Sequence, residues 1–594
     1  MDMPMKSLSK ATFLSAGLVF ILARATLAQG EANEVIVKAM RDESQRNISQ
    51  LTLEKYKPPF FLAYQFVDAH TLNIRAALGE LRQSQETPIR TDFVRLMVGD
   101  YALNDENFVG GRGGLFAGGS GALPVPLEND YAAIRRAFWI QTDRIYKAAL
   151  EDYDAKLTAL KQQNKSDSEK MDDYSKIVPT NLVVKGPAFV FDKPRWEKVA
   201  REVSGLFRSC DQIMSSSVVI SFADATVYLV SNEGTQVRFP VSVACLWINV
   251  FTQAEDGEPL TDHLTYCAPT PEQLPPVDQI KADAQGLADF IVALRKAPVF
   301  ADSYSGPVVF EGSAVAALMA EKLFDEEGLI ASREPVYAVE NAGQQGNMNR
   351  LESKLNQRIC SNKLTIKAVP KMKSFNNIPL AGSFEVDAEG VVPKDELVLV
   401  EQGILRTLLN DRVPTLKVKE SNGHSRPVLS RGGYFTAQKA PGVIEATYAD
   451  GLPMASFRKE VLREAADNGL SSIYLVRKLQ QQNPGMNREM YYAAARSAAL
   501  SQPIGLYRLN VKTGEEQLVR SAVFSDFPIT TFKRVTRGSK DQMVHNTILS
   551  STGMDVPVSF IVPQGLVFDD VSLEKVKITK PKLRLVPNPV LAEK

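Results

Sequence analysis

A strand-like run passes directly into a helix-like run in the stretch Gly306-Pro-Val-Val-Phe-Glu-Gly-Ser-Ala-Val-Ala-Ala-Leu-Met-Ala-Glu-Lys-Leu-Phe-Asp325. The short apolar run from Pro307 to Phe310 predicts a buried strand. Ser313 is a favourable N-cap and Gly328 a favourable C-cap, so a helix is predicted between them. Its apolar residues recur at helical spacing and form one stripe, made of Val315, Leu318, Met319 and Leu323.

The predicted helix carries part of a metal-binding pattern. A zinc-peptidase helix has two histidines about one turn apart, because neutral imidazoles bind zinc, and a glutamate that activates the zinc-bound water. Here Glu321 is present, and the stretch contains no histidine. Glu321 and Asp325 lie at i and i+4, where like charges repel. With the acidic residues at 326 and 327 they form either a solvated helix end, which we favour, or a site for a hard cation or an acid/base pair.

In sequence and setting this stretch resembles the TldD/PmbA family, also called modulator-of-gyrase proteins, whose TldD branch has His-Glu-x-x-x-His at this point. On that pattern Ala320 replaces the first histidine, Glu321 keeps the glutamate as a vestigial catalytic position, and Asp325 replaces the second histidine. The family's remaining zinc ligand is a late cysteine, and no cysteine follows Cys360. The resemblance therefore implies the metal-free PmbA branch, also called TldE.

Four other segments resemble family motifs and occur in the family's order. They are the hairpin at 227–235, the Asp-x-Glu-Gly run at 384–390, the segment 397–412 and the glycine-containing loop 420–426. Gly403 lies between two apolar runs, which predicts a hairpin turn independently of any resemblance. The match covers roughly residues 190 to 575.

The remaining patterns predict an α+β fold. Helical periodicity covers 33–54, 128–174 with a break near Asn164, 195–215 and 277–296. The second of these segments has the inward candidates Ile134, Phe138, Ile145, Ala149 and Leu157. Strand patterns cover 56–66, 218–249, 364–369, 398–410, 443–448, 472–478, 504–510, 522–524 and 556–562. We predict a signal peptide at 1–28, an N-terminal mixed α/β domain with long helices at 29–297, a mostly β C-terminal domain of the TldD/PmbA type at 298–580, and a tail at 581–594.

Composition and the N-terminus indicate an exported protein that does not bind nucleic acid. Lys+Arg and Asp+Glu both number 69, so no basic field is available to hold a polyanion. Lys6 and Lys10 precede a short apolar run, and Thr26 to Ala28 offer small residues for cleavage. No later segment reaches the ~18 consecutive apolar residues of a membrane span. The mature chain is therefore expected to be soluble, and periplasmic or extracellular.

The cysteines, histidines and small motifs indicate no other chemistry. The four cysteines, Cys210, Cys245, Cys267 and Cys360, allow two bridges in three connectivities or free thiols, and no Cys-x-x-Cys pair is available for a zinc knuckle. The isolated histidines His70, His263, His424 and His545 are interpreted as structural rather than metal-binding. The glycine-rich segment 110–121 lacks a phosphate-loop ending and is interpreted as a loop, and Ser421 to His424 as a turn.

The resemblance implies a metal-free subunit in peptide proteolysis. In the family, two kinds of subunit pair around a cavity to cleave unfolded or extended peptides, so the expected partner is a zinc-bearing TldD-like sibling, with a self-paired dimer as the alternative. No cofactor is expected. Two alternative functions remain: an active metallopeptidase with a non-standard metal site, for which zinc is required, and a peptide-binding protein without catalysis.

Overall fold

A computed structural model describes most of the chain between residues 34 and 583. The described ranges are 34–53, 56–110, 123–163, 171–301, 303–324, 328–338, 351–429, 435–483, 485–487, 490, 499–551, 554–576 and 583. The predicted signal peptide, nearly all of the glycine-rich segment, Asp325 and most of the predicted tail lie outside these ranges. Within them, no helix is both long enough and apolar enough to cross a membrane.

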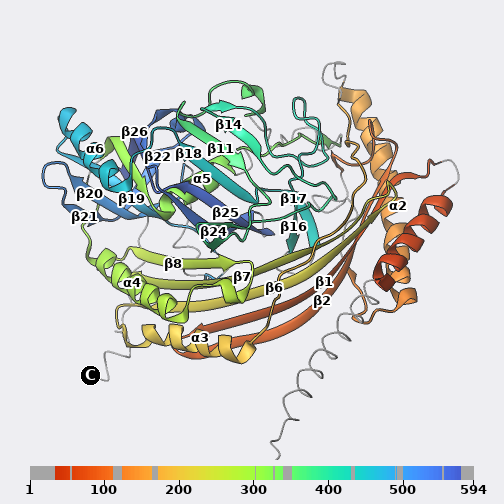
Figure 1. The fold of residues 1–594 in the computed structure, drawn as a ribbon, viewed down its shortest axis with the longest axis horizontal. Helices are drawn as coiled ribbons and strands as arrows, with labels where there is room; N and C mark the ends of the chain where they lie inside the picture. Colours follow the sequence, from red (N-terminus) through yellow and green to blue (C-terminus); the bar gives the residue numbers. More distant parts are fainter. Residues whose placement is uncertain are drawn as a thin grey trace, which may run out of the picture.

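A curved sheet of seven strands dominates the first half of the chain (Figure 1). Its order is β4-β2-β1-β6-β7-β5, and β8 also pairs with β7. The long strands are antiparallel neighbours: β1 (Pro59–Ala77), β2 (Glu80–Val98), β6 (Ser215–Ser231), β7 (Gln236–Gln253) and β8 (Pro259–Ala268). Two short strands, β4 (Leu123–Pro124) and β5 (Asn181–Val183), complete it. Below, this sheet is called the N-terminal sheet.

Alternation along β1 separates the two faces of the N-terminal sheet. The even-numbered residues Leu62, Tyr64, Phe66, Leu72 and Ile74 are buried under helices. Those helices are 34–50 and α2 (Tyr131–Gln163) at one end, and α3 (Lys193–Gly205) and α4 (Val277–Lys296) at the other (Figure 1). The odd-numbered residues Phe61, Ala63, Val67 and Ala69 point to the opposite face, where the second half of the chain lies.

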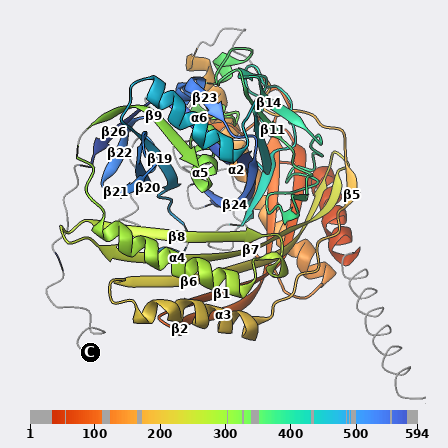
Figure 2. The same ribbon diagram turned by 60° about the vertical axis from the view of Figure 1, so that its left-hand side comes forward.

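The second half of the chain is mostly β. One sheet has the order β15-β14-β11-β18-β25-β24, and the other has β21-β20-β19-β9-β26-β22 with β23 on β26. Their strands are β9 (Tyr304–Glu311), β11 (Leu364–Ala368), β14 (Leu397–Glu401), β15 (Ile404–Leu405), β18 (Val443–Tyr448), β19 (Ser472–Leu479), β20 (Pro503–Asn510), β21 (Glu516–Val519), β22 (Ala522–Asp526), β23 (Val535–Gly538), β24 (Gln542–Ser551), β25 (Met554–Pro563) and β26 (Gly565–Lys575). Helix α5 (Ser313–Leu323) is buried in the core between these sheets, and α6 (Met454–Asp467) packs outside (Figure 2).

Short strand pairs complete the described structure. The hairpin β16 (Ser425–Leu429) and β17 (Phe435–Lys439) lies beside the N-terminal sheet, and β12 (Ser374–Phe375) pairs with β13 (Ile378–Pro379). The parallel pair of β3 (Phe108–Val109) and β10 (Val336–Tyr337) joins the two halves of the chain. The first half of the chain therefore contacts the second half through side chains of the N-terminal sheet and through the backbone of β3.

The predicted α+β class is confirmed, including the largely β second half. Helix 277–296 and strand 443–448 have the predicted bounds, and the Gly403 hairpin forms with positive φ at Gln402 (46°) and Gly403 (80°). The proposed division of the chain at residue 297 remains a prediction. Helix α6 was not predicted.

Several helix ends differ from the prediction. The helix predicted for 195–215 ends at Gly205 and continues only as a short 3-10 turn, because β6 begins at Ser215. Helix α2 ends at Gln163, next to the predicted break near Asn164, but Leu157 on it is only half-buried while the neighbouring Lys156 is buried. Helix α5 has Gly312 rather than Ser313 at its N-cap and ends at Leu323, five residues before Gly328.

Of the two bridges that the four cysteines allow, one is present. Cys245 and Cys267 are directly opposite in the antiparallel β7–β8 pair, with a Cα to Cα distance of 4.3 Å, and are bridged. Cys210 and Cys360 are free thiols. The bridge follows from strand register, which places the two side chains next to each other.

Candidate functional site

Helix α5 occupies the position where the sequence resembles a zinc-peptidase helix. It is buried on nearly all sides rather than along one stripe: Ala314 to Ala320 and Leu323 are all buried. Glu321 is half-buried, and its Oε1 accepts a hydrogen bond from the backbone N–H of Ser501 at 2.9 Å. The adjacent Lys322 donates from Nζ to the carbonyl of Ala499 at 2.9 Å. Both polar side chains therefore fasten the helix to residues 499–501.

The residues present on α5 do not fit zinc. Ala320, at the position of the first family histidine, has only a methyl group and is 5% exposed. Glu321 is engaged with Ser501 N, and Asp325 lies outside the described residues. Across the described ranges, no group of three or more His, Cys, Asp or Glu side chains is arranged to hold a metal ion. We therefore derive no chemical step through a metal at this helix.

The four histidines lie in three separate places. His70 pairs with Glu86 on the surface of the N-terminal sheet, with 3.1 Å between Nε2 and Oε1. Burial lowers the pKa of His263 to about 3 and that of His545 to about 4, and the two rings are close enough for His545 to contribute to the His263 shift. His424 is buried apart from these, its pKa is lowered by burial to about 3, and its Nδ1 is 2.9 Å from Asn422 Oδ1. The buried environments of His263, His424 and His545 favour neutral, structural imidazoles.

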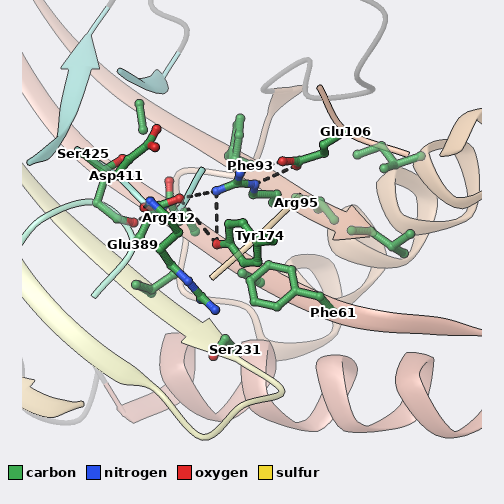
Figure 3. A pocket seen from close by; sticks show the side chains of 18 of the residues that line it. Phe61, Phe93, Arg95, Glu106, Tyr174, Ser231, Glu389, Asp411, Arg412 and Ser425 are labelled. Carbon is green, nitrogen blue, oxygen red and sulfur yellow. Dashed lines mark hydrogen bonds and ion pairs between the residues drawn. The ribbon is translucent and has the colours of Figure 1, made fainter. Parts of the chain in front are cut away.

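A cavity of about 250 Å³ lies between the N-terminal sheet, α2 and the second half of the chain (Figure 3). Its polar lining residues are Gln65, Arg95, Asp105, Glu106, Asp152, Tyr174, Ser231, Glu389, Asp411, Arg412, Ser425 and Thr436. Its apolar lining residues are Phe61, Ala63, Phe93, Val94, Leu96, Ile145, Ala149, Leu229, Ala388 and Ala437. The cavity is therefore lined by residues that are far apart in the sequence, from Phe61 to Ala437.

The Asp-x-Glu-Gly run forms one wall of this cavity, and Asp387 fixes its shape. One carboxylate oxygen of Asp387 accepts N–H bonds from Glu389 at 2.9 Å and Val391 at 2.8 Å, and the other accepts from Ser425 N at 3.1 Å. Gly390 has φ +82°, and a Cβ there would lie 2.6 Å from Thr235 Cγ2. The loop therefore requires glycine for both its backbone conformation and its close approach to the N-terminal sheet.

Arg95 connects the two halves of the chain across the cavity. Its guanidinium donates to Glu106 in a bidentate pair at 2.7 and 2.6 Å, to Tyr174 Oη at 3.2 Å, and to Glu389 Oε1 (Figure 3). Burial raises the pKa of the Glu389 carboxyl, and Arg95 opposes that rise. Burial and then the charge of Glu106 raise the pKa of Asp105 well above its usual range.

Arg412 makes a second connection of the same kind. Its guanidinium donates to both carboxylate oxygens of Glu233, each at 2.7 Å, and to the Ser175 carbonyl at 2.7 and 2.9 Å. It also lies over the Tyr174 ring, 4.0 Å from the centroid. Its backbone N–H donates to Glu389 Oε2 at 2.9 Å. Arg412 is 1% exposed, so all of these contacts are shielded from solvent.

The sequence indicated only part of this site. Residues 384–390 and 397–412 were predicted to resemble family motifs, without a role in a site. Arg95, Glu106 and Tyr174 were not indicated by the sequence. A signal was available for Gln65, because it is a polar residue at an apolar-facing position of a predicted strand. Nothing in the local pattern marks Tyr174, which lies in an irregular segment.

Comparison with known family models finds one match in the second half of the chain. Residues 305–443, which include α5, the Asp-x-Glu-Gly run and Arg412, match the family model of the PmbA/TldA metallopeptidase C-terminal domain. This match and the shared fold described below support a TldD/PmbA family protein. The match does not distinguish the branches of the TldD/PmbA family. No curated protein matches the sequence.

Solved structures of TldD/PmbA-type proteins share the fold. A putative modulator of DNA gyrase from Thermotoga maritima aligns with a TM-score of 0.55 and 14% identity over 86% of this chain and 96% of its own. TldE from Thermococcus kodakarensis aligns with a TM-score of 0.55 and 14% sequence identity, over 90% of this chain and 100% of its own. A putative modulator of DNA gyrase from Bacteroides thetaiotaomicron aligns with a TM-score of 0.54 and 13% sequence identity, over 92% of this chain and 99% of its own. At these identities the likeness concerns the fold alone.

Proposed function

We propose that this chain is an exported, metal-free, PmbA-like subunit that holds unfolded or extended peptides and pairs with a zinc-bearing TldD-like sibling, which supplies the hydrolytic site. The observation that carries the proposal is the state of α5. A buried methyl group occupies position 320, and the carboxylate of Glu321 is engaged by Ser501 N. A general base must be free to reach a metal-bound water, and this one anchors a helix instead.

The cavity supports a holding role for this subunit. It combines an apolar wall with buried polar groups, which is the usual composition of a ligand site. Its lining residues come from both the N-terminal sheet and the second half of the chain, and β-sheets are a known means of binding extended peptides. The peptide itself and the sibling remain part of the proposal.

The proposal is tested by reconstitution. The mature chain alone should not cleave an unfolded peptide, and addition of a sibling with His-Glu-x-x-x-His should give cleavage that a histidine substitution in the sibling abolishes. Glu321→Gln in this chain should leave cleavage by the pair within about twofold, because the amide oxygen still accepts from Ser501 N. Stoichiometric zinc or manganese in this chain alone, lost together with activity on Glu321→Ala, would instead establish the active-metallopeptidase alternative.

Partner and location are tested on the native protein. Co-purification from the native host should recover a chain with the His-Glu motif; a solitary monomer argues against pairing, and a dimer of this chain alone selects the self-paired alternative. The N-terminal sequence of the mature protein should begin near Gln29 in a periplasmic or extracellular fraction. An intact Met1 on a cytosolic protein would remove export from the proposal.

A further inference from the structure

We infer that the cavity beside Glu389 binds an alkylammonium group, either the amino end of a peptide or a lysine side chain. The inference adds a ligand chemistry to the proposed function and rests on it only in naming a peptide as the source of the amine.

The charge of the lining favours a cation. Five carboxyl groups line the cavity, those of Asp105, Glu106, Asp152, Glu389 and Asp411, against the two guanidinium groups of Arg95 and Arg412. Both guanidinium groups already donate to Glu106, Glu389, Glu233 and the Ser175 carbonyl. Their donors are committed to the protein, so an anionic ligand would have to displace an internal ion pair. Asp411 is paired with Lys439 at 3.3 Å, so a cation would meet the carboxyl groups that these arginines and this lysine do not engage, those of Asp105 and Asp152.

Gln65 provides a second, independent indication of a donor ligand. It is 6% exposed and lines the cavity from β1. Its Nε2 donates to the Ala388 carbonyl, which fixes the orientation of the amide, and its buried Oε1 accepts no hydrogen bond within the described structure. The Oγ of Ser231, on the same cavity wall, is also buried without a hydrogen-bond partner there. A buried acceptor without a donor is costly, and a bound N–H donor removes that cost.

The buried carboxyl groups of the cavity also favour a bound cation. Burial raises the pKa of Asp105, Asp152 and Glu389, because their charged forms are poorly solvated in the cavity wall. An ammonium ion within a few ångströms stabilises the carboxylate form. The neighbouring apolar residues, Phe61, Phe93, Ile145 and Ala149, offer a surface for the alkyl part of the ligand. The cavity has room for about eight water volumes, enough for an aminoacyl group.

The first experiment uses small probes that do not depend on any peptidase activity. Calorimetric titration of the mature full-length chain with glycinamide should show binding, and N-acetylglycinamide should bind at least about tenfold more weakly. Gln65→Leu and Asp152→Asn should each weaken glycinamide binding several-fold. Asp143→Asn, on an exposed part of α2 where Asp143 pairs with Lys147, is the matched control and should bind like the wild type.

The two variants guard against misfolding in different ways. Gln65→Leu also removes the bond to Ala388, whereas Asp152 takes no part in the Arg95 and Arg412 ion pairs, so its amide variant should melt like the wild type. Equal binding of the acetylated probe, wild-type affinity in Asp152→Asn, or no binding of glycinamide by the folded chain would each overturn the inference.

A second set of probes distinguishes the two sources of the amine. A lysine-free peptide with a free amino end is compared with its N-acetylated form and with an N-acetylated form that contains one lysine. If only the peptide with a free amino end binds, the ligand group is the amino end. If the N-acetylated peptide with one lysine also binds, the cavity accepts a lysine side chain. If all three bind equally, the inference fails. Glycinamide binding without cleavage by the reconstituted pair would contradict the proposed function alone, and cleavage without amine-dependent binding would contradict this inference alone.

Discussion

At the scale of single residues, the buried imidazole of His263 contributes to the response of this protein to acid. His263 on β8 is 7% exposed, its Nδ1 has no hydrogen-bond partner within the described structure, and burial lowers its pKa to about 3. In the unfolded chain the same imidazole has a pKa of about 6.5. As the pH falls below that value, the unfolded chain takes up a proton that the folded chain does not. Stability from this residue is therefore present at neutral pH and is lost on acidification.

We predict that His263→Phe reduces the acid sensitivity of the fold. Between pH 7.5 and pH 5 the free energy of unfolding of the wild type should fall by about 2 kcal/mol on account of this residue alone, since 1.5 pH units at about 1.4 kcal/mol per unit separate pH 5 from the unfolded pKa. Urea unfolding at both pH values measures the difference. The same loss in the variant as in the wild type would show that His263 is not kept neutral in the folded chain.

At the scale of secondary-structure elements, a two-residue turn fixes the register between β14 and β15. The β14–β15 hairpin turns at Gln402 and Gly403, both with positive φ, which is the geometry of a type I′ turn. A Cβ at Gly403 would lie 2.4 Å from the Cys360 carbonyl oxygen and 2.6 Å from that of Ser361. The turn is thus packed tightly against the segment that precedes β11. Glycine is needed there for space as well as for conformation.

Gly403→Ala should destabilise the chain by at least about 2 kcal/mol, because backbone atoms must move to admit the methyl group and the left-handed conformation is strained for alanine. Gly469→Ala is the matched control: its φ is also positive, at 71°, but no atom lies within 4 Å of the added Cβ. Its cost should be about 1 kcal/mol. Thermal unfolding of both variants separates the contribution of contact from that of conformation, and equal losses would contradict the steric argument.

At the scale of the whole molecule, Arg412 fastens the second half of the chain to the N-terminal sheet. It pairs with Glu233 from the β6–β7 turn and with the Ser175 carbonyl, and it is fully buried. Removing one member of a buried pair leaves the other charge without compensation, which is more costly than the net value of the pair. Exposed pairs such as that of Arg406 with Glu401 are worth far less.

We predict that Arg412→Met costs about 3 to 5 kcal/mol of unfolding free energy. Arg406→Met, the exposed control, should cost less than about 1 kcal/mol. Hydrogen exchange should also rise in the 231–235 turn and the 387–391 loop of the Arg412 variant, since both are held through Glu233 and Glu389. If stability falls but exchange in these two segments is unchanged, Arg412 does not join the two halves in the way described.

The sequence by itself determined the features that depend on neighbours along the chain. Helix α4, strand β18 and the Gly403 turn follow from periodicity and turn chemistry, which act over a few residues. The order of the motifs was enough to indicate the family. The absence of a histidine at 320 could also be seen directly, although Asp325 lies outside the described residues.

Only the tertiary structure decided which residues share a site. Arg95 and Glu389 are 294 residues apart, and they meet because the N-terminal sheet curves around the second half of the chain. Lys156 is 1% exposed because Asp173 and two backbone carbonyls surround its ammonium group, although a lysine in a charge-rich helix is expected to face solvent. The Cys245–Cys267 bridge was selected from three connectivities by strand register. Periodicity specifies which face of an element is buried, whereas the partner of that face depends on contacts across the whole fold.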